Sequence, residues 1–415
     1  MPPMTRHWPA LLLCLVVLAG APARAQTPPA PVAPVPVAPV PVAAAPEVTW
    51  HQDVLPIVRT RCQSCHEPSG VAPFSLLTHA QALEHLSEMG EAVRVGYMPP
   101  WQPADGCQSF RDARRLTRAE TDTLLAWVAQ GGPAGPPASA LPPVKPTTGL
   151  SPAHIQLTAA PVGLPGEERT RCYAFSWDSK VPRDVTGYEV QPGGPSVHHV
   201  TLYSAPELEV QALEAQDPEP GWTCSNEPGS LNARLIGVWA PGAEATRFPS
   251  GTGIRLAAGA PFVLQVHTAA PRAGERAPGP TVARLQLAPK PVPRVAQLLP
   301  LWKSGYSIPG KAAGFKLSRT QPIPAQGALL GVFPHMHGLG RHLKLEAAGA
   351  CAIDIPYWDA TGHQAYFFEN PAGIALGPDS QLSLSCTWNN PEPRRVPASE
   401  GSAGEACLIY LYVAE

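Results

Sequence analysis

Short apolar runs separated by turn-forming residues dominate the sequence after residue 147, and they constrain the fold more than any other feature. The runs include IQLTA, YAFSW, HHVTLY, FVLQVH, ARLQLA, LLGVF, LKLEA, LSLSC and CLIYLYV. Each has the length of a strand and lies between turn clusters, which is typical of antiparallel β structure rather than of alternating strands and helices. Because about 265 residues is large for one sandwich, we expect two, covering 148–293 and 294–415.

The first 25 residues have the pattern of an export signal. Arg6 and His7 precede the apolar run from Ala10 to Ala19, and Ala23-Arg24-Ala25 fits a small-x-small cleavage site. The run is too short for a membrane span, and we expect no span in the mature chain. Residues 26–46 are a Pro/Ala/Val tract, which predicts a semi-rigid spacer. The chain is therefore expected to be periplasmic or secreted.

A helical segment is predicted at 47–132, between the spacer and a second Pro/Gly-rich linker at 133–147. Capping boxes at Thr49, Thr78 and Thr117 each have Gln or Glu three residues later. The helices that follow have apolar faces, namely Val54, Leu55 and Val58, then Leu83, Leu86 and Val93, then Leu124, Leu125 and Val128. The segment predicts a small all-α domain.

The helical segment contains Cys62-Gln63-Ser64-Cys65-His66, the C-x-x-C-H pattern of c-type haem attachment. The two thiols form thioethers with the porphyrin, and His66 is an axial iron ligand. A disulfide or a zinc knuckle is the alternative, but zinc needs four ligands and no second Cys/His pair stands nearby. Met98, in a proline-fixed loop, is the expected sixth ligand, and Met89 is its competitor. A Met/His iron suits electron transfer.

Cysteine content and charge limit the class of protein further. Nine cysteines minus Cys14 of the signal and the haem pair leave six: Cys107, Cys172, Cys224, Cys351, Cys386 and Cys407. An even number in an oxidising compartment favours up to three disulfides. The net charge of −2 does not suggest a nucleic-acid partner, which would be bound through counterion release.

Five of the 13 histidines lie in strand-like contexts after residue 190. His335 and His337 alternate in GVFPHMHGLG, so a strand places both rings on one face. His198 and His199 are adjacent, so they can bind one ion only where a twist or bulge interrupts the strand. His267 ends FVLQVH. Imidazole sites without cysteine suit copper or zinc.

The remaining histidines of this region have no such pattern. They are expected at the surface: His154, His342 and His363.

These histidine segments carry a resemblance to a known family. VHHVTLY, VLQVH, FPHMHGLGRHLKL, WAPGAEATRFPSGTGIRL, CTWNN and GEACLIYLYV resemble the copper type II, ascorbate-dependent monooxygenases, the family of peptidylglycine α-hydroxylating and dopamine β-monooxygenase. The chain is most similar to bacterial members in which a c-type cytochrome domain precedes the copper core. The resemblance covers most of 47–415. It implies a multidomain fold, with a small all-α cytochrome c domain and two antiparallel, jelly-roll-like copper sandwiches that face a solvent-filled cleft.

The resemblance also implies the ligands of two coppers. An electron-transfer copper would be bound by the following residues: His198, His199 and His267. A second copper, where O2 is activated, would be bound by His335, His337 and a methionine, and the two histidines are the predicted catalytic residues. The family's methionine precedes a cysteine in the last strand, and here that position is Ala406. Met336 is aimed at the opposite face by strand alternation. The second site is then two-histidine, weaker, water-completed or inactive.

The disulfides follow the same picture. The resemblance implies Cys172–Cys224 around the His198-His199 strand and Cys386–Cys407 beside the second copper. Cys107 and Cys351 are left as a bridge from the haem domain to the copper core.

The function expected from these observations is an exported, haem- and copper-containing monooxygenase. It would hydroxylate a C–H bond of an unidentified small-molecule or peptide substrate with O2, using electrons from an external donor that pass through the haem. The alternative, motivated by Ala406, is a non-catalytic haem–copper electron carrier or copper-binding protein. A third possibility, a zinc-binding or purely structural sandwich, requires the order of the histidines to be coincidental.

Overall fold

The computed structural model describes the following residues: 47–63, 65–68, 72–137, 149–160, 168–225, 227–269, 279–323, 325–360, 362–399, 401 and 403–415. The predicted signal peptide at 1–25 and the spacer at 26–46 lie outside them. The chain from Glu47 to Glu415 forms one compact unit. Among the described residues, no helix is long and apolar enough to cross a membrane.

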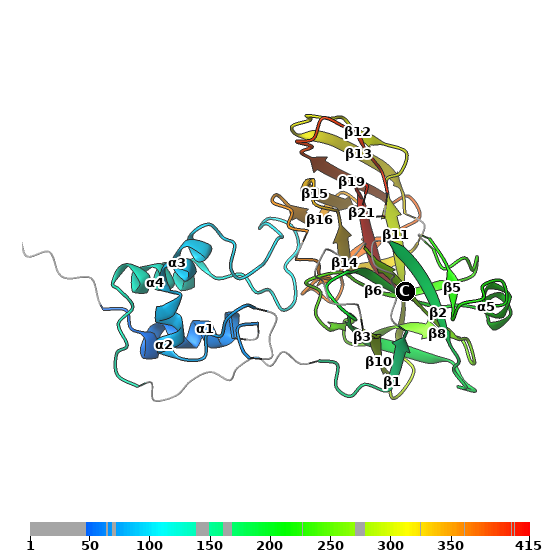
Figure 1. The fold of residues 1–415 in the computed structure, drawn as a ribbon, viewed down its shortest axis with the longest axis horizontal. Helices are drawn as coiled ribbons and strands as arrows, with labels where there is room; N and C mark the ends of the chain where they lie inside the picture. Colours follow the sequence, from blue (N-terminus) through cyan, green and yellow to red (C-terminus); the bar gives the residue numbers. More distant parts are fainter. Residues whose placement is uncertain are drawn as a thin grey trace, which may run out of the picture. The chain divides into compact units, whose positions relative to one another are not determined.

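Most of the helices precede the strands in the chain (Figure 1). They are η1 (Trp50–Val54, a π-helical turn), α1 (Leu55–Arg61), α2 (His79–Glu84), α3 (Leu86–Arg94), α4 (Arg118–Ala129) and, among the strands, α5 (Glu207–Glu214). The predicted capping boxes at Thr78 and Thr117 are confirmed. The box at Thr49 is wrong. Its main-chain N–H and its hydroxyl donate to Asp53, four residues on, at 2.7 and 3.2 Å, because the chain forms a π-helical turn there.

The prediction that 47–132 is a cytochrome c domain is wrong. The helices are short, and they do not assemble into that fold. The chain between α3 and α4 packs instead on the strands: Phe110 is buried in a core of the β region, and Trp101 and Phe110 lie 5.3 and 5.5 Å from the ring of Tyr366. The main-chain N–H of Arg111 donates to the carbonyl of Phe367 at 2.8 Å. Capping signals are local, so they could not show that this loop's apolar residues have partners about 250 residues away.

The strands form a central mixed sheet with two smaller sheets beside it (Figure 1). The central sheet has the order β1 (Ile155–Ala159), β10 (Thr281–Leu287), β3 (Arg183–Gln191), β8 (Thr252–Leu256), β11 (Arg294–Trp302), β21 (Leu408–Ala414), β14 (Gly327–His335) and β17 (Tyr366–Phe367); β7 (Thr246–Arg247) pairs with β3, and β18 (Ile374–Leu376) with β14. The β4 sheet has the order β5 (Trp222–Thr223), β2 (Arg169–Phe175), β9 (Phe262–Thr268), β4 (Val197–Ser204) and β6 (Arg234–Trp239). The β19 sheet has the order β13 (Phe315–Pro322), β19 (Gln381–Trp388), β15 (Gly340–Ala347) and β16 (Ala350–Ile355); β12 (Ser307–Ile308) pairs separately with β20 (Val396–Pro397).

The prediction of two separate antiparallel sandwiches is also wrong. β8 and β11 pair in parallel, with Arg294 opposite Thr252 and Ala296 opposite Ile254. This pair joins strands from both predicted sandwiches into one mixed sheet. Alternation within a run predicts a strand but not which strand it pairs with. The junction therefore could not be read from the sequence.

The two smaller sheets cover opposite faces of the central sheet. Along β21, Leu411 and Val413 belong to the core shared with the β19 sheet, whereas Tyr412 and Ala414 belong to the core shared with the β4 sheet. Successive side chains of a strand point to opposite faces, so this division places one small sheet on each face. A strand that is buried on both faces has a continuous apolar sequence, which explains the run CLIYLYV.

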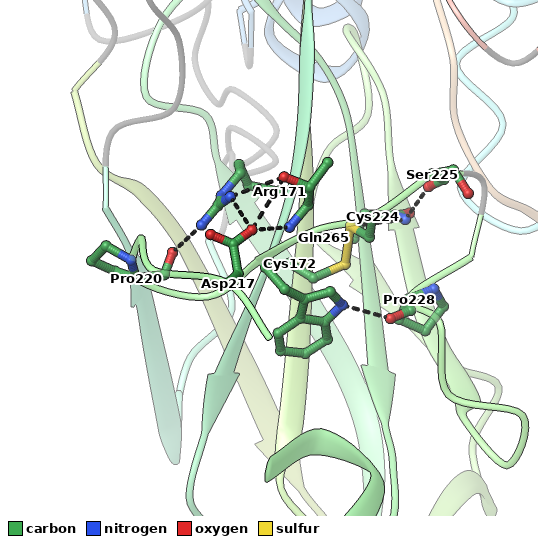
Figure 2. The surroundings of a disulfide bond; sticks show 10 residues. Arg171, Cys172, Asp217, Pro220, Cys224, Ser225, Pro228 and Gln265 are labelled. Carbon is green, nitrogen blue, oxygen red and sulfur yellow. Dashed lines mark hydrogen bonds and ion pairs between the residues drawn. A yellow bond between two sulfur atoms is a disulfide. The ribbon is translucent and has the colours of Figure 1, made fainter. Parts of the chain in front are cut away.

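All three predicted disulfide pairs are present, namely Cys107–Cys351, Cys172–Cys224 and Cys386–Cys407. Figure 2 shows the second, which ties β2 to the loop after β5. Beside it, Gln265 of β9 donates to the carbonyl of Ser225 at 2.5 Å. On the other side, the guanidinium of Arg171 donates to Asp217 at 2.8 Å. Disulfides are typical of proteins from oxidising compartments.

Candidate metal centre

The first histidine set lies on two neighbouring strands of the β4 sheet. His199 of β4 is directly opposite His267 of β9, and the register shifts between Val197 and His199. That irregularity frees His198 from strict alternation, so its ring joins the ring of His199 on one side. The interruption that the adjacent pair required is confirmed.

The nitrogens of this set are spaced as ligands of one ion. The Nδ1 atom of His199 lies 3.2 Å from Nδ1 of His198 and 3.2 Å from Nδ1 of His267. One ligand nitrogen from each of the three rings lies within 4.8 Å of the other two. For metal–nitrogen bonds of about 2.0 Å, a separation of 3.2 Å corresponds to an angle of roughly 106° at the ion, which is near-tetrahedral.

A carboxylate orients the first set. The Nε2 atom of His267 lies 2.6 Å from the carboxylate of Glu168, just before β2. With the proton assigned to Nε2, this hydrogen bond leaves the lone pair of Nδ1 for an ion. Burial lowers the pKa of His267, and the carboxylate offsets only part of that shift. The neutral ring that metal binding needs is therefore favoured.

The second set lies at the end of β14. His335 is the last residue of that strand and His337 follows in the turn, with their rings 5.0 Å apart and their Nε2 atoms 3.1 Å apart. The Nδ1 atom of His337 lies 2.9 Å from the carbonyl of Gly404, so its Nε2 faces His335. The predicted arrangement of both rings on one side is confirmed.

The turn of the second set is held by Glu405. Its carboxylate accepts from the main-chain N–H groups of His337 and Leu339, at 3.1 and 2.6 Å, and from the indole of Trp388 at 3.1 Å. Burial raises the pKa of this carboxyl to about 7, although its hydrogen-bond donors offset part of the shift. Both oxygens serve the protein, so Glu405 is a support and not a donor to an ion.

The second set has no methionine. Met336 is fully buried and belongs to the core shared with the β19 sheet, which confirms its predicted orientation. Ala406, at the position of the expected ligand, is 5% exposed and has no donor atom. Because neither Met336 nor position 406 offers a sulfur ligand, the second set keeps only the ring nitrogens of His335 and His337 as expected donors.

His363 is the site residue that the sequence did not reveal. It was expected at the surface, but it is 4% exposed and its ring lies 4.8 Å from the ring of His335. It lies in the chain between β16 and β17, near His335 and the main chain of Pro241, and the residues around it in sequence carry no pattern that would have indicated this position. Of the other two histidines expected at the surface, His342 is half-buried and pairs with Asp354 at 2.6 Å, and His154 is exposed.

The two sets are in contact. The rings of His198 and His337 lie 5.3 Å apart, and those of His199 and His335 lie 6.5 Å apart. The expected solvent-filled cleft between two copper sites does not separate them. Burial, together with repulsion from neighbouring rings, lowers the pKa of His198 to about 3 and holds that of His335 well below its usual value. The cluster is therefore neutral at pH 7, with lone pairs ready for metal ions.

The C-x-x-C-H segment begins directly after α1. Cys62 and Cys65 are not joined by a disulfide, which removes that alternative. Burial, and to a lesser degree the neighbouring Cys65 thiol, raises the pKa of Cys62 to about 12. His66 is buried with its Nδ1 3.0 Å from the carbonyl of Phe74, so Nε2 is left for iron.

The sixth iron ligand stays a prediction. Met98 is half-buried in the turn after α3, where its main-chain N–H donates to the carbonyl of Ala92 at 3.1 Å. Met89 packs against the helical core together with Cys62, as expected for a core residue.

Comparisons with known proteins do not add a family. No family model and no curated protein matches the chain. Among solved structures, the major capsid protein P2 of bacteriophage PM2 is similar with a TM-score of 0.27 and 10% identity, over 63% of this chain and 98% of that one. PBCV-1 VP54, in a structure fitted into a reconstruction of the virophage Sputnik, has a TM-score of 0.24 and 11% identity, over 65% and 96%. Likeness at these scores carries no argument about fold or function.

Proposed function

We propose that the protein is a periplasmic or secreted haem- and copper-containing oxidoreductase that hydroxylates a C–H bond with O2. An external donor would reduce a haem attached at Cys62 and Cys65, and the electrons would pass to copper at the histidine cluster. The overall reaction consumes one substrate C–H bond, one O2, two electrons and two protons, and it yields an alcohol and one water.

One observation carries the proposal, which is the geometry of the first set. The Nδ1 atom of His199 lies 3.2 Å from the Nδ1 atoms of both His198 and His267, and the ring of His198 contacts the ring of His337 in the second set. Imidazole donors without thiolate suit copper or zinc. A haem site in the same chain favours the redox-active ion, since zinc cannot exchange electrons. Copper, when bound, supplies one-electron transfer and the activation of O2.

The residues of the chain have distinct roles in this proposal. Glu168 fixes the tautomer of His267, and the Gly404 carbonyl does the same for His337. Glu405 holds the turn that positions His337. His66 would be the axial ligand of the haem iron, oriented by the carbonyl of Phe74.

The second candidate is a non-catalytic haem–copper electron carrier, and Ala406 favours it. A thioether donor stabilises Cu(I), the form that must meet O2, and this chain has none at that position. Both functions require the first set to bind copper. They differ in whether the reduced protein consumes O2.

The test uses the full chain, matured with haem and loaded with copper. The haem is reduced in the absence of O2, mixed with aerated buffer, and followed by its absorption while O2 uptake is measured. The oxidoreductase predicts haem reoxidation that requires copper and is lost in His199→Ala. Haem reoxidation at the same rate with and without copper would contradict the proposal, and copper-dependent electron exchange without O2 uptake would favour the carrier.

A further inference from the structure

The second histidine set lacks a third donor among the residues expected to supply one. Ala406 has no donor atom, and Met336 is buried in the core on the far side of the strand. Glu405 uses both carboxylate oxygens on N–H donors of the protein. An ion held by His335 and His337 alone would have two protein ligands, which is fewer than the three or four that tight nitrogen sites provide.

We propose that His363 supplies the third nitrogen of the second set, so that the six histidines form one dinuclear copper centre with three donors to each ion. This deepens the proposed function and rests on it for the identity of the metal. Two separate observations support it: the state of the His363 ring and the contact between the two sets.

The ring of His363 is buried, and although main-chain groups of Met336 and Pro241 lie near it, its nitrogens have no partner in good hydrogen-bond geometry. The residue is 4% exposed. A buried polar group that is left without a hydrogen-bond partner needs an explanation, and a bound ion is one. A neutral imidazole has one unprotonated nitrogen, and the lone pair of that nitrogen can bind an ion.

The main chain places this ring beside the second set. The N–H of His363 donates to the carbonyl of Pro241 at 3.2 Å. The side chain of Gln102 donates to the carbonyls of Asp359 and Gly362 at 3.1 and 2.8 Å. These bonds fix the loop, and the ring lies 4.8 Å from His335 and 5.2 Å from Trp358. Among the described residues, only the first set has ligand nitrogens that all lie within 4.8 Å of one another, so the His363 ring would turn toward His335 and His337 when an ion binds.

The contact between the sets makes two ions neighbours. His198 and His337 belong to different sets, yet their rings lie 5.3 Å apart, close to the 5.0 Å between His335 and His337 within one set. Cu(II) ions bound at both sets would therefore be close enough to interact magnetically. Two ions separated by a cleft would not interact in this way.

The first experiment counts copper in the full, haem-loaded chain at equilibrium with chelator-buffered Cu(I). The wild type is expected to bind two coppers. His363→Phe, which keeps an aromatic ring beside Trp358, is expected to weaken one copper by about 100-fold and to leave the other unchanged, because a direct ligand should matter at least as much as an outer-shell partner. His342→Phe is the matched control, since His342 is outside the cluster and pairs with Asp354. His363→Gln replaces the Phe variant if thermal denaturation shows that the latter does not fold.

The second experiment identifies the donors. Copper-edge X-ray absorption of the wild type is expected to show nitrogen and oxygen scatterers without sulfur. The double variant His363→Phe/Ala406→Met is expected to recover the second copper and to gain a sulfur scatterer. Oxidised wild type should show dipolar broadening or loss of the Cu(II) paramagnetic resonance signal.

The outcomes separate this inference from the proposed function. A His363→Phe protein that binds both coppers like the wild type, or two isolated Cu(II) signals without dipolar broadening, would overturn the dinuclear centre but leave a copper protein. A wild type that binds only one copper would also overturn it and would favour the electron carrier. A wild type that binds no copper would defeat the proposed function itself.

Discussion

The two histidine sets differ in what fixes their geometry. In the first set, the register of β4 against β9 places His199 opposite His267, so the main-chain hydrogen bonds of a sheet determine the spacing of the rings. In the second set, His335 ends a strand and His337 lies just beyond it, where Glu405 accepts two hydrogen bonds from main-chain N–H groups of this segment and a third from the indole of Trp388. A sheet holds its residues in place by many main-chain hydrogen bonds, whereas this turn has few of them and relies in addition on the carboxylate of Glu405.

The partners of the ligand rings differ in the same way. His267 is oriented by the side chain of Glu168, but His337 is oriented by the main-chain carbonyl of Gly404. A side-chain partner can be removed by one substitution and can tune the ring by its charge. A main-chain carbonyl stays in place when its residue is substituted, and it carries no charge that could tune the ring. Both sets should respond to substitutions of their ligands, but the first should also respond to substitution of a side-chain partner, and the second to substitutions that move its turn.

The largest effect is expected at the centre of the first set. His199→Ala removes the nitrogen that lies 3.2 Å from both others, and it should weaken the copper of that set by at least about 100-fold. Equilibrium with a chelator of known affinity measures the loss, and the copper of the second set serves as the internal reference. Retention of both coppers with wild-type affinity would show that the spacing of these rings has another cause.

Substitution of the partner should have a smaller effect. Glu168→Gln keeps the size of the side chain but removes its charge, so His267 becomes a weaker donor and the first copper should be held about 30-fold less tightly. The same titration checks this, and the second copper should not change. An equal loss at both coppers would contradict the assignment of Glu168 to the first set.

The third prediction tests whether the turn at His337 positions only the second set, while the sheet positions the first. Glu405→Gln places an amide where two main-chain N–H donors require an acceptor, so the turn at His337 should loosen and the second copper should weaken by about tenfold. The first copper is the control within the same molecule. If the first copper weakened more than the second, the comparison between sheet and turn would be wrong.

Local sequence signals predicted where most of the clustered histidines lie on their strands, but not that the two sets come into contact. Alternation placed His335 and His337 on one side, and adjacency meant that His198 and His199 could bind one ion only where a twist or bulge interrupts the strand, because both follow from the period of a strand. His363 was missed because its neighbours come from a loop that is fixed by Gln102, more than 250 residues away in sequence.

The fold was missed for the same reason. The parallel pairing of β8 with β11 depends on which strands become neighbours in the folded sheet. The sequence of a single strand does not specify its neighbour. The helical segment was misread as an independent domain because its capping boxes at Thr78 and Thr117 are real, whereas Phe110 finds its partners among the strands.

The smallest expected effect separates the stability of the sheet from the two metal sites. Asp184 of β3 lies at the junction of the two halves, where it accepts from Arg255 at 2.7 and 2.9 Å and from the N–H of Val292 at 2.8 Å. Burial raises the pKa of Asp184, but these donors outweigh burial and lower it overall. Asp184→Asn should cost about 1 kcal/mol of unfolding free energy at pH 7, a modest value because Arg255 is partly exposed to solvent.

The lowered pKa of Asp184 determines how the stability difference between wild type and Asp184→Asn changes with pH. Since the folded carboxyl has a lower pKa than the unfolded one, near 3.9, its contribution is complete above pH 4–5 and is lost as the pH falls through the folded value. Denaturant unfolding from pH 7 to pH 3 should therefore show wild type and Asp184→Asn converging at the acidic end, while both copper affinities at pH 7 stay equal to those of the wild type. A loss of copper from either set in this variant would show that the junction of the sheet, and not only β4, β9 and the Glu405 turn, positions the histidines.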